Sequence, residues 1–95
     1  MVEVPETRRE RMRGLIGRED LPPGHALLLE GARSIHTIGM RFPLMAAFLD
    51  DGLRVVGVKV VRPGRILLPR LRARHVLECP EGSELRLGER LVPAG

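Results

Sequence analysis

The chain has 95 residues, of which 43% are hydrophobic, and it carries a formal net charge of +4. This length fits a single domain over residues 1–95, and the composition excludes wholesale disorder. The only cysteine is Cys79, which excludes an internal disulfide and a cysteine-based zinc cluster. Because the N-terminus lacks the apolar stretch of a signal peptide and no apolar run is long enough for a membrane span, we expect a cytoplasmic protein.

The composition is also consistent with a thermophilic source. Lys59 is the only lysine beside many arginines, and the sequence contains no asparagine and no glutamine. Loss of these thermolabile amides is typical of thermophilic proteins. The arginine bias has a second explanation, which is genomic base composition.

A short helix is predicted near the N-terminus. Thr7 and Glu10 have the spacing of a capping box, in which each side chain binds a backbone amide of the first turn. The apolar residues that follow recur on one helical face, namely Met12, Leu15 and Ile16. Gly17 is a residue type that commonly ends a helix, and residues 21–24 read as a turn.

From residue 25 onward the chain consists of short apolar runs separated by Gly and Pro. An apolar run covers residues 25–30, and strands are predicted over residues 34–37, 44–49, 53–61, 66–68, 75–79 and 85–92. Short, evenly spaced strands predict a mainly β fold, a small single-domain β-barrel or sandwich with one short N-terminal helix.

The strongest local signal is a hairpin at Asp50, Asp51 and Gly52. Asp-Gly between apolar runs is typical of a type I′ turn, because glycine tolerates its positive φ. Both faces of the following strand, residues 53–61, are largely apolar. We therefore expect this strand to be central and covered on both sides.

Five segments together resemble the motifs of a known family. They are E-R-M-R-G-L-I-G-R at 10–18, S-I-H-T-I-G-M-R-F-P-L at 34–44, F-L-D-D-G at 48–52 followed by V-V at 55–56, A-R-H-V-L-E at 73–78 with Gly82, and G-E-R-L at 88–91. In their order and spacing they are similar to the domain of unknown function 192 family, also called uncharacterised protein family 0127. The resemblance implies a compact, mostly β fold and no defined activity. After Pro-Leu this family usually carries Asp, where this chain has Met45.

The histidines and the cysteine do not form a recognised catalytic or metal pattern. No pair among His25, His36 and His75 has a metal-ligand spacing, so we predict no metal. The sequence has neither a G-x-G-x-x-G motif nor a P-loop lysine motif, which excludes nucleotide binding by those routes, and we predict no cofactor. On a strand, His75 and Cys79 lie roughly 13 Å apart, too far for a thiol–imidazole pair. We interpret Cys79 as a small buried hydrophobic residue.

Two regions contain candidate ligand-binding side chains. Ser34 and His36 would point the same way on a strand, and His36 either fixes a loop through hydrogen bonds or contacts a ligand. Arg74 and Glu78 would share another strand face, as an ion pair, a loop anchor or a ligand-facing pair. No second carboxylate is evidently placed beside Glu78, which disfavours a two-carboxylate hydrolase.

The sequence therefore predicts a small binding or interaction module, more in keeping with a non-enzyme, for a small anionic ligand or a protein partner. The predicted site comprises Ser34, His36, Thr37, Arg41, Arg74 and Glu78, with Arg74 holding an anionic group. We expect no membrane partner, and a monomer or weak dimer.

Two alternatives remain. The first is a nucleic-acid binder that uses Arg62, Arg65, Arg70, Arg72 and Arg74. The last three of these would line one face of an extended segment and follow phosphates, although such charges also occur on solvated edge strands. The second alternative, a hydrolase of unknown substrate, is weakened by Met45.

Overall fold

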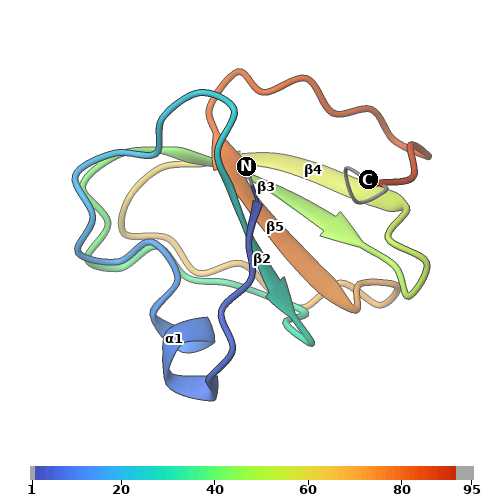
Figure 1. Cartoon of the computed structure of the whole chain (residues 1–95), viewed down its shortest axis with the longest axis horizontal. Coiled ribbons are helices and arrows are strands. Elements are labelled where there is room, and N and C mark those ends of the chain that lie inside the picture. The colour runs from blue at the N-terminus through green and yellow to red at the C-terminus, as the bar shows by residue number, and fades with distance from the viewer. Residues whose placement is uncertain (1, 92–95) are drawn as a thin grey trace.

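A computed structural model describes residues 2–91 and shows them folded around a five-stranded sheet. The strands are β1 (Val2–Glu3), β2 (Ala26–Glu30), β3 (Leu44–Leu49), β4 (Val55–Val61) and β5 (His75–Pro80), and a helix, α1 (Arg8–Arg13), follows β1. Their order in the sheet is β1-β2-β5-β3-β4, so β5 runs between β2 and β3 (Figure 1). β1 is parallel to β2, and the other pairs are antiparallel.

The mainly β class is confirmed. Over residues 2–91 the strands form one open sheet with edges at β1 and β4, and neither a closed barrel nor a second sheet of a sandwich is observed. The strand predicted over residues 44–49 coincides with β3. The prediction of a central strand over residues 53–61 is wrong, because β4 lies at an edge, with Lys59 and Val60 exposed.

The side chains of the sheet divide between two hydrophobic clusters, one on each face, because successive residues of a strand point to opposite sides. We call these clusters the first and the second core. The first core includes Leu44, Ala46 and Phe48 of β3 with Leu27 and Leu29 of β2, Val61 of β4 and Val76 of β5. The second core includes Met45, Ala47 and Leu49 of β3 with Val55, Leu77 and Cys79.

Irregular segments cover both faces in place of a second sheet. Over the first core lie Leu15, Leu21, Ile35 and Met40, all buried. Leu85 and Leu91, from the segment after β5, pack against the second core. The β strands therefore form a central layer between two layers built largely of loops.

α1 is shorter than the sequence predicts. The Thr7 hydroxyl accepts a hydrogen bond from the backbone N–H of Glu10 at 3.1 Å, as expected of an N-cap. The helix ends at Arg13 because Gly14, whose N–H makes the last helical bond to the Glu10 carbonyl, has a non-helical φ of 53°. The interpretation of Leu15 and Ile16 as part of a helical face is therefore wrong. Leu15 is nevertheless fully buried.

The hairpin between β3 and β4 has a different turn from the one predicted. Asp50 Oδ1 accepts hydrogen bonds from the N–H groups of Gly52 at 3.0 Å and Arg54 at 2.8 Å. The positive φ falls on Leu53, at 62°, and not on Gly52. The prediction of a type I′ turn is thus wrong, and the Asp50 side chain organises a longer loop instead.

Three predicted strands are reduced to isolated contacts. Residues 34–37 and 66–68 meet in one antiparallel bridge between His36 and Ile66, and residues 85–91 contribute one bridge between Arg54 and Arg90. Val92, the predicted end of the last strand, lies outside the described residues. In the part of the chain that is described, no helix is both long enough and apolar enough to span a bilayer.

Candidate functional site

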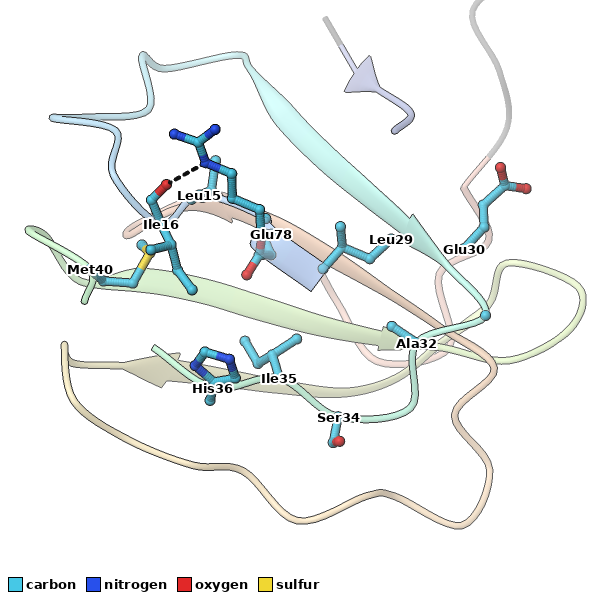
Figure 2. Close-up of a pocket in the computed structure, with 13 residues that line it drawn as sticks. Leu15, Ile16, Leu29, Glu30, Ala32, Ser34, Ile35, His36, Met40 and Glu78 are labelled. Atoms are coloured by element: carbon cyan, nitrogen blue, oxygen red, sulfur yellow. Dashed lines mark hydrogen bonds between the residues drawn. The ribbon is translucent and has the colours of Figure 1, made fainter. Parts of the chain in front are cut away.

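A cavity of about 290 Å³ lies over the first core. The segment after α1 and the segment between β2 and β3 bound it, and the sheet supplies its base (Figure 2). Its polar or charged lining residues are Arg13, Glu30, Ser34, His36 and Glu78, and its apolar walls are Leu15, Ile16, Leu29, Ala32, Ile35 and Met40, with Gly14 and Gly31. We refer to it as the Glu78 cavity.

Glu78 is the buried charged group of this cavity. In the register of the sheet, Glu78 lies opposite Leu27 on β2 and Ala46 on β3, and both of these residues belong to the first core. Strand alternation therefore turns the Glu78 side chain into that core, and it is only 3% exposed. Figure 2 shows its carboxyl group pointing into the space bounded by Ile35 and His36. Its Oε1 atom has no hydrogen-bond partner.

Gly14 allows the backbone to pass close to this carboxyl group. A Cβ atom built at Gly14 would lie 2.7 Å from Glu78 Oε1, inside van der Waals contact. The φ of 53° with a ψ of −125° at this position is also unfavourable for residues other than glycine. The next residue, Leu15, donates a backbone hydrogen bond to the Glu78 carboxyl group.

Burial changes the ionisation of both titratable side chains on this part of β5. It raises the pKa of Glu78 to about 7, against partial opposing effects of the Arg18 charge and the Leu15 backbone hydrogen bond. Burial, followed by the Glu78 charge, raises the pKa of Cys79 to about 12. Glu78 therefore exchanges a proton near neutrality, whereas Cys79 stays a thiol and is a poor nucleophile.

The residues predicted as a site separate into two groups. Ser34, His36 and Glu78 line the same cavity, whereas Thr37, Arg41 and Arg74 do not line it. Arg41 is exposed, and its Nη1 lies 3.9 Å from Glu19 Oε1. Arg74 is also exposed, and its guanidinium donates to the carbonyls of Leu71 and Ala73.

Thr37 has structural hydrogen bonds. It is fully buried, and its hydroxyl donates to the Arg62 carbonyl at 2.6 Å and accepts from the Arg65 N–H at 2.9 Å. Its backbone N–H donates to the Arg65 carbonyl at 2.7 Å. These bonds hold the segment that carries Ser34 and His36 against the loop after β4.

Sequence reasoning missed several residues of the cavity. Arg13, Glu30 and Met40 line it from three different segments, and nothing in their local pattern indicates a common location. The signal that was available is the resemblance, since the cavity brings together parts of the segments 10–18, 34–44 and 73–78. Glu78 itself is detectable as a charged residue within the apolar run of β5.

The arginines of the nucleic-acid alternative are all exposed on the loop between β4 and β5. The sequence predicts Arg70, Arg72 and Arg74 on one face of an extended segment, but Leu71 and Arg72 form a turn closed by a hydrogen bond from the Ala73 N–H to the Arg70 carbonyl at 3.1 Å. That expectation is wrong. The Arg70 guanidinium carbon lies 4.6 Å from the centre of the Phe48 ring, so this side chain partly covers the first core.

The histidines lie in different surroundings. His36 is exposed at the cavity, His25 is partly buried, and His75 Nδ1 accepts a hydrogen bond from the Gly31 N–H at 3.1 Å. Within residues 2–91, no group of three or more His, Cys, Asp or Glu side chains is placed to hold a metal ion.

Comparison with known proteins identifies similar sequences. The profile of the DUF192 family, described as "Uncharacterized ACR", matches residues 1–90. UPF0127 protein PYRAB11210 of Pyrococcus abyssi is 33% identical over 87 residues, which cover 85% of this chain and 72% of that protein. UPF0127 protein PH1112 of Pyrococcus horikoshii is 43% identical over 49 residues, 52% of this chain and 43% of that protein's length. No solved structure shows a significant match.

The raised pKa of Glu78 predicts a stability that depends on pH. A carboxyl group whose pKa is raised in the folded state contributes its full share of stability when the pH is below its unfolded pKa of 4.5. This stability is lost as the pH rises through the folded pKa of about 7. Relative to Glu78→Gln, we expect the free energy of unfolding to fall by about 3 kcal/mol across this range. Urea denaturation of both proteins at several pH values measures the difference. Parallel curves would contradict the raised pKa.

The Thr37 hydrogen bonds predict a structural role for this residue. Thr37→Val keeps the shape but leaves buried backbone groups of the loop after β4 unpaired, so we expect the free energy of unfolding to fall by about 1–3 kcal/mol. Thr37→Ser keeps the hydroxyl, so its free energy of unfolding should fall by less than that of Thr37→Val. Equal losses in the two variants, measured by urea denaturation, would show that the hydroxyl is not responsible.

Proposed function

The chain belongs to the DUF192 family, and from this premise we propose that it is a binding module whose small-molecule ligand occupies the Glu78 cavity. The observation that carries the proposal is Glu78 Oε1, a buried acceptor without a hydrogen-bond partner on a carboxyl group that points into a cavity. Buried polar atoms are nearly always paired, and leaving one unpaired costs about 1–3 kcal/mol. A ligand with a hydrogen-bond donor would supply the missing partner.

The lining of the cavity indicates what kind of molecule fits it. Most of the wall is apolar, which is typical of small-molecule sites with a few polar groups that fix orientation. An anionic group would be repelled by ionised Glu78. Any anionic part of the ligand would therefore lie toward Arg13, at another part of the lining, and not beside the carboxyl group.

Binding is better supported than hydrolysis. Glu30 also lines the cavity, but Figure 2 shows its carboxyl group directed away from that of Glu78. A pair of cooperating carboxylates is therefore not supported by this arrangement. Cys79 belongs to the second core, on the opposite face of the sheet, and is no candidate nucleophile for this cavity.

A screen by NMR tests the proposed function. Fragments that bind the full chain should shift the backbone amide signals of Ala32, Ile35 and Met40, which line the cavity. Ala32→Trp, which fills the cavity, should abolish these shifts, and Ala32→Leu should weaken them. A library that never perturbs these amides, or hits that survive Ala32→Trp in a folded protein, would overturn the proposal.

A second candidate function is nucleic-acid binding by the loop of residues 62–74. This loop contains five arginines and no acidic residue, and all five arginines are exposed. If they contact phosphates, the logarithm of the binding constant should fall steeply and linearly with the logarithm of salt concentration. Arg62→Gln together with Arg65→Gln should reduce the slope by about two, and Arg8→Gln with Arg9→Gln is the charge-matched control. Absence of binding at low salt would reject this function.

A further inference from the structure

We infer that the ligand of the Glu78 cavity is a small amine with an apolar body, bound as its ammonium ion. The inference rests on the proposed function and names the ligand class for the same cavity. It stands on the unpaired carboxyl oxygen, the absence of a described ion pair to it and the apolar walls around it.

Glu78 lacks a cationic partner within the described residues. The ion pairs there join Arg18 to Glu3 at 2.8 Å and Arg41 to Glu19 at 3.9 Å, and neither includes Glu78. Arg18, the side chain whose charge acts on Glu78, is thus already bound to another carboxylate. An isolated buried carboxylate is costly, and a cation in contact with it reduces this cost.

The Glu78 carboxyl group lacks a hydrogen-bond donor at Oε1 and a cationic partner among the described residues, and an ammonium group supplies both. It donates a hydrogen bond to Oε1, and it supplies the positive charge that stabilises the ionised form. A ligand hydroxyl or amide would supply the hydrogen bond without the positive charge, and a ligand carboxylate would supply neither. The chemistry of the carboxyl group therefore ranks an amine first among ligands of equal size.

The walls select the remainder of the ligand. Leu15, Leu29, Ile35 and Met40 contribute apolar surface to the cavity, and Met adapts to irregular shapes. Burying a hydrocarbon body against them is favourable by roughly 25 cal/mol per Å² of apolar surface. A branched alkyl amine combines this body with the required ammonium group.

Four other charged or titratable side chains bear on Glu78. Arg13 and His36 line the cavity, and Glu30 lies at its edge with its carboxyl group directed away. Arg18 acts through its charge. Arg13 is partly engaged, because its Nε donates to the Ile16 carbonyl at 3.4 Å. Amine binding to the protonated carboxyl group releases one proton, so affinity should rise with pH through the pKa of about 7 of Glu78.

Three molecules with similar apolar bodies test the inference: isoamylamine, isoamyl alcohol and isocaproate. Calorimetric titration of the full chain at about pH 8 should show the amine bound about tenfold more tightly than the alcohol, with isocaproate weakest. Glu78→Gln should remove the preference for the amine, and Glu81→Gln, an exposed glutamate outside the cavity lining, is the matched control. Equal or tighter binding of the alcohol or of isocaproate would overturn the inference.

The pH dependence gives a second readout on the unmutated chain, which needs no variant to fold. The amine should bind about tenfold more weakly at about pH 6 than at about pH 8, and His36→Gln should leave this dependence in place. Affinity independent of pH would overturn the inference. If none of the three molecules binds but the NMR screen finds cavity ligands, the ligand class is wrong and the proposed function stands. If the screen also fails, both are wrong.

Discussion

The position of β5 in the middle of the sheet is the constraint on which the other features depend. This strand pairs with β2 along one edge and with β3 along the other, and the first and second cores cover its two faces. Because both faces are covered, β5 has no solvent-facing side on which to carry a charged residue. Glu78 must therefore enter one of the two cores, and alternation assigns it to the first. Its high pKa and its unpaired oxygen follow from that placement.

The cover over the first core is shaped around this carboxyl group. Gly14 ends α1 and lets the backbone approach Oε1, and Leu15 then donates its N–H to the carboxyl and buries its side chain. On the other side of the cavity, the hydrogen bonds of Thr37 hold the neighbouring residues in an irregular conformation without a continuous strand ladder. His36 consequently lies at the cavity while remaining exposed. The Glu78 cavity is thus an opening in the cover of the first core.

Local patterns predicted the elements better than their arrangement. The apolar run of β3 and the N-cap at Thr7 are properties of neighbouring residues, and both appear as expected. The edge position of β4 depends on which strands pair with it, and an apolar pattern on both faces does not specify this. β1 has two residues and forms only by pairing with β2, so no periodicity could reveal it. Likewise, Ser34 and Glu78 are 44 positions apart, and only the fold brings them to one cavity.

At position 45 the resemblance leads us to expect Asp, and this chain has Met. The two faces of the sheet determine which core this difference affects. Met45 pairs with Cys79 across β3 and β5, and both belong to the second core, whereas Glu78 points into the first. An aspartate in this position would place a second carboxyl group beside a buried thiol, on the far side of the sheet from the cavity. Met45 is an apolar member of the second core and does not line the Glu78 cavity. Met45 therefore bears on chemistry in the second core, and it does not weaken ligand binding at Glu78 on the opposite face.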